Sequence, residues 1–151
     1  MAVSKNVRFT FRSAGAFFWL SALSEITSPT SGVPLFGAVH SGAVAVIYHL
    51  VYTAMFAVVG VGLWAGKPWG DKAVLAVTAF YTLDQFQSLL NPATMAAAFY
   101  QGLGDYAALL PATPRTIMPI MVDVTWVVLA CWWAFAWYAY RWRGYFRQEG
   151  R

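Results

Sequence analysis

Charged side chains are scarce in this sequence, and their scarcity excludes most classes of water-soluble protein. Only 11% of the 151 residues are Asp, Glu, Lys or Arg. A soluble domain carries about 25% of such residues, because its surface faces water. The chain is instead 60% hydrophobic and 18% aromatic, with a mean hydropathy of +0.54. The composition therefore predicts one domain whose outer surface faces lipid.

Cysteine and histidine are almost absent. The single cysteine, Cys131, excludes an internal disulfide and a thiolate metal cluster. The two histidines, His40 and His49, would lie on opposite faces of one helix, and no pair of metal-ligating residues has i, i+3 or i+4 spacing. We therefore expect neither a metal nor another cofactor. A single buried histidine can also ligate a chlorophyll-type pigment, and Ala45, one turn before His49, would leave room for the macrocycle.

Basic residues stand at three places along the chain. They precede the first apolar run, flank the turn at residues 67–72 and close the chain, and only Arg115 lies elsewhere. The net charge is +4, but no basic stripe exists, so we expect no nucleic-acid partner. Because Lys and Arg favour the cytoplasmic side of a membrane, both chain ends and this turn are predicted to be cytoplasmic. Abundant Ala, Val, Gly and Trp favour a bacterial inner membrane.

Four apolar segments are long enough to cross the hydrocarbon core as helices, which takes roughly 20 residues each. Gly, Pro and Asn separate them. The segments cover residues 11–27, 42–65, 73–90 and 117–140. The sequence thus predicts an all-α polytopic membrane protein, a single four-transmembrane-helix bundle over residues 1–151.

The flanking segments complete this prediction. Basic residues precede the first apolar run, as in a signal peptide, but Glu25 follows at once without an Ala-x-Ala site, so we expect an uncleaved span. Residues 28–41 are rich in Gly, Pro and Ser and are expected to form a loop. The connection at 93–116 is expected to contain a short interfacial helix around residues 96–100.

One ionisable residue falls at membrane depth in each predicted span: Glu25, His49, Asp84 and Asp123. At 1.5 Å per helical residue, each lies roughly 6–10 Å inside the outer end of its segment. Ionisable groups at such depth are costly and usually face the interior of a bundle, so we expect all four to meet there, each with a polar partner. One proton shared among the three carboxyls, with His49 as partner, would suit them to acid–base chemistry as catalytic residues.

Polar and aromatic residues extend this cluster along the same helix faces. Five of them are predicted to contact a ligand: Tyr48, Tyr52, Tyr81, Gln87 and Trp126. A second interpretation stays open, in which interhelical hydrogen bonds worth about 0.6 kcal/mol each only fasten the bundle. Ser, Thr or Asn would do so at lower cost than ionisable groups, which favours a site for a ligand, proton or ion.

The arrangement resembles the EXPERA family of four-span proteins, which includes the emopamil-binding protein, a sterol isomerase, and the sigma-2 receptor. The likeness covers most of the chain. It rests on Glu25, His49, Tyr81-Thr82-Leu83-Asp84 and Asp123-Val124-Thr125-Trp126, one element in each span, and on the basic tail.

The sequence also departs from the family. The family has an acid at the position of His49, a histidine at that of Ser21 and an asparagine at that of Asp123. The resemblance implies that Glu25 and His49 move a proton, while Trp126 stabilises a carbocation through its π face.

Three functions are compatible with these observations. The first is a polar, acid-lined pocket in the outer half of the bundle that binds or isomerises an apolar small molecule, an isomerase-like membrane enzyme. The second is a non-catalytic accessory subunit of a larger membrane complex, in contact with lipids or pigments. The third is a small proton-coupled transporter, although Glu25 lies close to the outer end for that role. Membrane lipid, an apolar small molecule and other membrane subunits are the corresponding partners.

Overall fold

Helices make up most of the protein, which confirms the all-α prediction. The computed structural model describes residues 4–109 and 111–148. Its elements are α1 (Lys5–Thr27), β1 (Val33–Leu35), β2 (Ala38–His40), α2 (Ala43–Trp64), α3 (Gly70–Leu90), α4 (Pro92–Leu103), the 3-10 helix η1 (Gly104–Leu109), α5 (Pro114–Arg141) and α6 (Gly144–Gln148). A short helix is therefore present, as α4, in the connection where one was expected.

The helix boundaries follow local capping signals. The Ser4 hydroxyl accepts a hydrogen bond from the Val7 amide at the start of α1, 3.4 Å away. Thr113 and Thr116 form a reciprocal capping box at the start of α5, just before and after Pro114. The apolar segments at 42–65, 73–90 and 117–140 correspond closely to α2, α3 and α5. The first helix begins at Lys5, earlier than the apolar run at 11–27, because its polar first turns are also helical.

A β-hairpin occupies part of residues 28–41, which were expected to form a loop. Val33 pairs with His40 and Leu35 with Ala38, in antiparallel register. The two turn residues have positive φ angles, 50° at Phe36 and 80° at Gly37, and this conformation is typical of a tight hairpin turn. Phe36 is an unusual residue at such a position, so the sequence carries no clear signal for a hairpin turn there.

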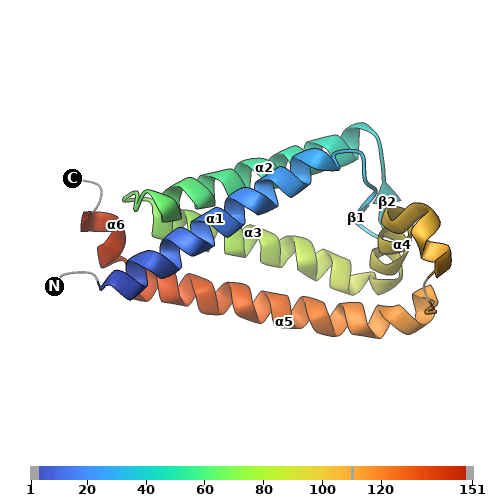
Figure 1. The fold of residues 1–151 in the computed structure, drawn as a ribbon. Coiled ribbons are helices and arrows are strands. Elements are labelled where there is room, and N and C mark those ends of the chain that lie inside the picture. Colours follow the sequence, from blue (N-terminus) through green and yellow to red (C-terminus); the bar gives the residue numbers. More distant parts are fainter. Residues whose placement is uncertain (1–3, 110, 149–151) are drawn as a thin grey trace.

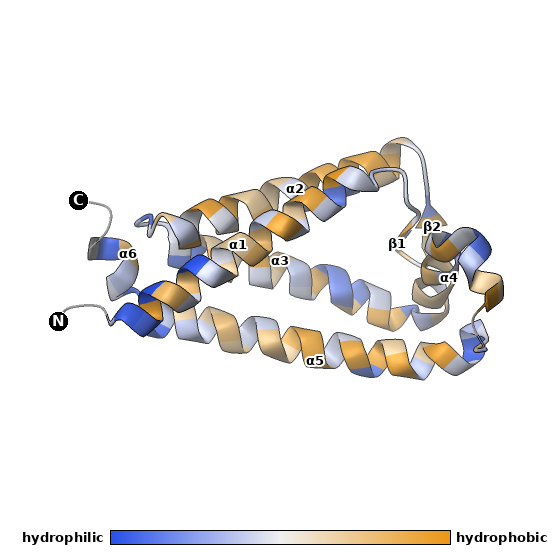
Figure 2. Cartoon of the chain, in the orientation of Figure 1, coloured by the Kyte–Doolittle hydropathy of each residue, from blue (hydrophilic) through white to orange (hydrophobic). Residues whose placement is uncertain are grey.

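The four long helices run side by side, with the chain ends at one end of the bundle and the hairpin and α4 at the other (Figure 1). α1 packs along α2, α3 lies against both α2 and α5, and α4 covers α5 near the hairpin end. α1 and α5 diverge toward the hairpin end, so the bundle widens there (Figure 1). Hydrophilic residues gather at the end with the termini, whereas the middles of α2 and α5 are largely hydrophobic (Figure 2).

Among the described residues, two helices are long and apolar enough to cross a membrane, by length and composition. The most apolar 18-residue stretches of α2 and α5 have mean hydropathies of 2.0 and 1.7. α1 and α3 do not qualify, and the apolar part of α3 contains Asp84 and two glutamines. The two qualifying helices favour association with a membrane.

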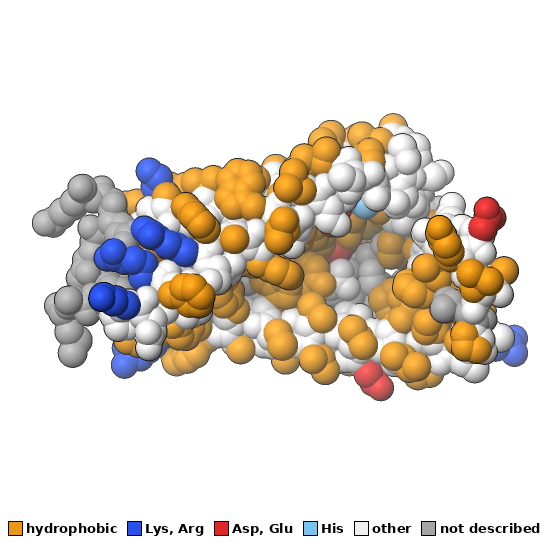
Figure 3. Space-filling view, in the orientation of Figure 1, with side chains coloured by type: hydrophobic (Ala, Val, Ile, Leu, Met, Phe, Trp, Pro, Cys, Tyr) orange, Lys and Arg blue, Asp and Glu red, His pale blue; other side chains and the backbone are white. Residues whose placement is uncertain are grey.

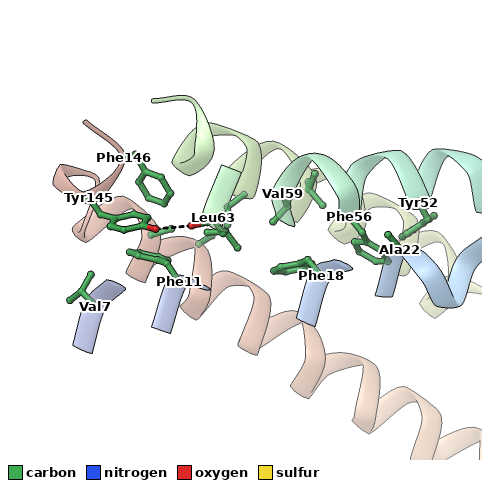
Figure 4. Close-up of a cluster of buried hydrophobic side chains, with 14 residues drawn as sticks. Val7, Phe11, Phe18, Ala22, Tyr52, Phe56, Val59, Leu63, Tyr145 and Phe146 are labelled. Atoms are coloured by element: carbon green, nitrogen blue, oxygen red, sulfur yellow. Dashed lines mark hydrogen bonds between the residues drawn. The ribbon is translucent and has the colours of Figure 1, made fainter. Parts of the chain in front are cut away.

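The end of the bundle near the termini is closed by aromatic side chains from α6. Tyr145 and Phe146 are buried, and Tyr145 stacks on Phe11 of α1 while the Phe146 ring contacts Phe11 at a tilt (Figure 4). The Tyr145 hydroxyl donates a hydrogen bond to the Leu63 carbonyl oxygen, 2.9 Å away. The predicted basic tail therefore contains a short helix that seals the core.

A close approach of α1 and α2 depends on glycine. A Cβ at Gly15 would lie 3.0 Å from the Gly60 carbonyl oxygen and 3.0 Å from the Trp64 amide nitrogen. Both are backbone atoms, so the helices must separate to admit a methyl group. We expect Gly15→Ala to destabilise the protein by about 1–3 kcal/mol, as overpacking does elsewhere. A lower thermal midpoint in detergent would show it. Gly102→Ala is the control, because nothing lies within 4 Å there.

Candidate functional site

α1 and α2 bring Glu25 and His49 together near the hairpin end. Glu25 lies in the last turn of α1, and His49 in the second turn of α2. His49 Nδ1 lies 2.6 Å from Glu25 Oε2, and the side chains are 13% and 24% exposed. On its other side, His49 Nε2 lies 3.3 Å from the backbone carbonyl oxygen of Ser31. The imidazole is thus held at both ring nitrogens.

These partners decide where His49 carries protons. The Ser31 carbonyl oxygen only accepts hydrogen bonds, so Nε2 carries a hydrogen when that bond forms. A further proton is then shared between Nδ1 and Glu25 Oε2. On nitrogen it produces an imidazolium–carboxylate pair, and on oxygen a neutral imidazole–carboxylic acid pair. Both forms have the same total charge. The proton can therefore move between Nδ1 and Glu25 Oε2 without a change in the net charge of the pair.

Asp84 of α3 forms the second part of the site. Its Oδ2 accepts hydrogen bonds from the hydroxyls of Tyr48, at 2.8 Å, and Tyr52, at 2.5 Å. Gln85 Nε2 donates to the same oxygen at 3.3 Å. Among the described residues, no donor reaches Oδ1. Asp84 therefore has one satisfied oxygen and one that remains open.

Asp84 lines a groove beneath the hairpin, between α2 and α3. This groove has a volume of about 280 Å³ and is largely apolar. Its lining residues are Leu35, Phe36, Tyr48, Phe80, Leu83, Asp84 and Gln87. A second groove of about 260 Å³ shares Leu35, Tyr48 and Phe80 with it, and Tyr52 lines its wall. The two together form a continuous apolar surface with a carboxylate at one end.

Tyr48 connects the two parts of the site. Its ring meets the neighbouring His49 ring edge-on, with centroids 5.7 Å apart, while its hydroxyl binds Asp84. No hydrogen bond between described residues joins the Glu25–His49 pair directly to Asp84. Figure 3 shows the surface hollowed between α2 and α5, with an acidic and a histidine side chain visible in the hollow. Three of the four predicted ionisable residues are thus brought together.

Gln87, predicted to contact a ligand, lines the groove and is also bound to the hairpin. Its Oε1 accepts a hydrogen bond from the Phe36 amide at 2.8 Å, and its Nε2 donates to the Pro34 carbonyl oxygen at 2.9 Å. Thr94 of α4 adds a bond to the Gly37 carbonyl oxygen at 3.0 Å. Gln87 therefore holds the hairpin over the groove. The spacing of polar residues along α3 predicts the helix face on which Gln87 lies. It does not predict that Gln87 binds the backbone of the hairpin.

An aromatic layer lies toward the termini from this polar layer. Trp132 of α5 stacks on Tyr81, with ring centroids 5.2 Å apart, and on Phe56 at 6.4 Å. Phe18 of α1 contacts the same indole at 5.3 Å. Glu25 is two turns beyond Phe18, and His49 two turns before Phe56, so the polar layer lies roughly 10 Å farther toward the hairpin end. Tyr81, predicted to contact a ligand, packs within the aromatic layer, and the sequence pattern does not single out Trp132.

Asp123 and Trp126 lie outside the site, which corrects the prediction that they face the bundle interior. Both side chains are exposed on α5, and the Trp126 side chain is 53% exposed. α5 turns Thr125, Leu129 and Trp132 inward, and Asp123 is on the opposite side of the helix from Trp132. Asp123 has no hydrogen bond or ion pair with any described residue.

Metal-ligating residues do not gather in groups of three anywhere in residues 4–109 and 111–148. The pair of Glu25 and His49 has Asp84 as a neighbour through Tyr48, but the three do not converge on one point. No known protein family, curated protein or solved structure matches this sequence. The functional argument therefore rests on the site itself.

Proposed function

We propose that the protein is an integral membrane protein of four spans that binds or isomerises an apolar small molecule by acid–base chemistry. The observation that carries this proposal is the environment of Asp84. Its carboxylate is held at one oxygen by three donors, is open at the other, and lines a groove that is otherwise apolar. Such an oxygen can accept a hydrogen bond from a hydroxyl or ammonium group, while the apolar body of the ligand fills the groove.

Membrane insertion of all four long helices is supported by the distribution of exposed side chains. Large apolar residues on the outside of every long helix are at least half exposed, among them Phe17, Ile47, Leu83 and Val127. Lys and Arg instead concentrate at the end with the termini (Figure 3). α1 and α3 run beside α2 and α5 for most of their length, so they would occupy the same layer of lipid. The basic end is then the cytoplasmic one, and the site lies in the outer half.

The acid–base step is assigned to the Glu25–His49 pair. It holds one shared proton, and the second oxygen of Glu25 has no hydrogen bond from a described residue. Protonation of a carbon–carbon double bond by this pair would produce a carbocation, and return of a proton from a neighbouring carbon to the deprotonated pair would complete an isomerisation. Asp84 would orient the ligand through its polar end.

The resemblance to the EXPERA family is retained only as part of this proposal. Glu25 and His49, to which the resemblance assigns proton movement, are 2.6 Å apart. The fourth-span segment does not support it, because Asp123 and Trp126 face away from the groove. Stabilisation of a carbocation, which the resemblance assigns to Trp126, is therefore assigned to the aromatic rings that line the groove, among them Phe36, Tyr48 and Phe80.

The proposal is tested by mass spectrometry of the purified full-length chain. We expect a defined apolar molecule in its organic extract, and uptake of deuterium by that molecule when the protein is incubated in D₂O. Glu25→Gln should retain the molecule but lose deuterium uptake, because the pair can no longer share a carboxyl proton. Asp105→Asn, an exposed acid in η1, is the matched control. An extract that contains only bulk lipid, or purification solely within a large complex, would contradict the proposal.

The orientation of the chain provides a separate test. In a Cys131→Ala background, we expect Thr30→Cys and Gln101→Cys to react with a membrane-impermeant maleimide from outside the cell. Lys67→Cys should react only after permeabilisation. All three positions are exposed in the structure, so labelling reports sidedness. The reverse pattern would place the site in the inner half of the membrane.

A further inference from the structure

The outward face of α5 carries the one predicted ionisable residue that the site does not use. Asp123 is exposed there, and Figure 3 shows an acidic side chain standing out from α5 among hydrophobic ones. α5 is also less buried than α2, the other helix that can cross a membrane. Of the most apolar 18 residues, 11% are buried in α5 and 28% in α2. The helix therefore presents a long apolar surface interrupted by one carboxylate.

In a membrane this carboxylate would lie too deep to reach water. Asp123 is roughly 9 Å from Ile117, where the apolar part of α5 begins. Its side chain is too short to extend over that distance, unlike the long side chains of Lys and Arg. Ionisable residues at such depth normally pair with another group. Within the described residues, Asp123 has no such partner.

Two small residues lie on the same face. Ala130 and Ala134 are both exposed, are spaced i, i+4, and fall within about 20° of the direction of Asp123 around the helix. Small residues at this spacing allow another helix to approach closely in a membrane. This face thus has small residues, at which another helix can approach closely, and an unpaired carboxylate about two turns nearer the hairpin end.

We infer that this face of α5 binds a transmembrane helix of a different protein that carries a lysine or arginine at the depth of Asp123. A second copy of this chain does not fit, because its described Lys and Arg residues lie toward the end with the termini or, at Arg115, at the start of α5, and none lies at the depth of Asp123. In a parallel pair of copies, Asp123 would face its own equivalent, and like charges repel. The inference rests on the membrane insertion in the proposed function, but not on the ligand groove.

The test uses a designed host helix of leucine and alanine with one lysine at the depth of Asp123. The full-length chain, carrying a donor fluorophore at its carboxyl end, is reconstituted with acceptor-labelled host helix in phosphatidylcholine vesicles. Energy transfer measures their association, and host helices with leucine or glutamate in place of lysine are compared. We expect the lysine host to associate about tenfold more tightly than the leucine host, and the glutamate host to associate least.

Variants of the chain locate the contact. Asp123→Asn should remove the preference for lysine, and Ala134→Leu should weaken association by filling the small-residue surface. Asp105→Asn should change nothing. Equal association of lysine and leucine hosts, an unaffected Asp123→Asn variant, or self-association through this face would overturn the inference. Carbonate extraction of the chain from the vesicles would overturn it together with the membrane insertion, whereas insertion without lysine-dependent association overturns the inference alone.

Discussion

Asp84→Asn is expected to lower retention of the bound molecule about tenfold or more while the thermal midpoint stays unchanged or rises. Asparagine keeps the shape of aspartate, and its amide oxygen still accepts hydrogen bonds from Tyr48 and Tyr52. The charge is lost, however, and the amide group replaces the open oxygen in the groove. A hydrogen bond to a charged group is worth about 1.5–3 kcal/mol, which corresponds to a loss of roughly tenfold to a hundredfold. Mass spectrometry of the extract and a thermal melt in detergent measure the two effects.

A companion variant separates binding from fastening. Asp84→Leu removes the acceptor for both tyrosine hydroxyls and leaves them unpaired, at a cost of about 1–3 kcal/mol each. It should therefore lower the thermal midpoint as well as retention. If Asp84→Asn retains the molecule as well as the unmodified chain does, the cluster only fastens the helices. The pocket proposal would then be wrong.

Trp132→Ala is expected to destabilise the protein by about 3–5 kcal/mol, the range found for large aromatic residues removed from a packed core. Its indole contacts Phe18, Phe56 and Tyr81, so the change opens a cavity shared by α1, α2, α3 and α5. Trp126→Ala on the same helix should change stability by no more than about 0.5 kcal/mol, because that side chain is 53% exposed. Thermal or denaturant unfolding in detergent compares the two.

The same two positions test whether Trp126 serves the ligand. The family resemblance assigns carbocation stabilisation to Trp126, whereas the structure exposes that side chain on the outside of α5. The conservative variant Trp132→Phe keeps an aromatic ring and should preserve most of the stability and of the retention. A loss of retention in Trp126→Leu, with Trp132→Phe unaffected, would show that α5 is rotated relative to the structure.

The helices themselves were largely predictable from sequence. Long apolar runs, with Pro, Gly and Asn between them, are local signals that need no tertiary contact. They located α2, α3 and α5 to within a few residues. The start of α1 was placed too late, because only the apolar part of that helix was counted and its polar first turns were not. The hairpin was missed since its turn uses Phe36, a residue that rarely adopts positive φ.

The candidate site was predictable in part. Glu25, His49 and Asp84 were selected because each interrupts an apolar helix, and the structure brings them together near the hairpin end. Gln87 lies on the expected face of α3, but its amide binds backbone atoms of a hairpin more than 50 residues away in sequence. No local pattern contains that information, because the partner is brought close only by the packing of the chain.

The sequence by itself determined which segments are helical and which helix contains each ionisable residue. Only the tertiary structure decided which side of α5 faces the interior of the bundle. Almost every residue around that helix is apolar, so its pattern does not distinguish an inner face from an outer one. Packing against α3 and α4 turns Thr125, Leu129 and Trp132 inward, and Asp123 and Trp126 are thereby left outside. A helix that is hydrophobic on all sides has its orientation set by the shape of its neighbours, which the sequence does not reveal locally.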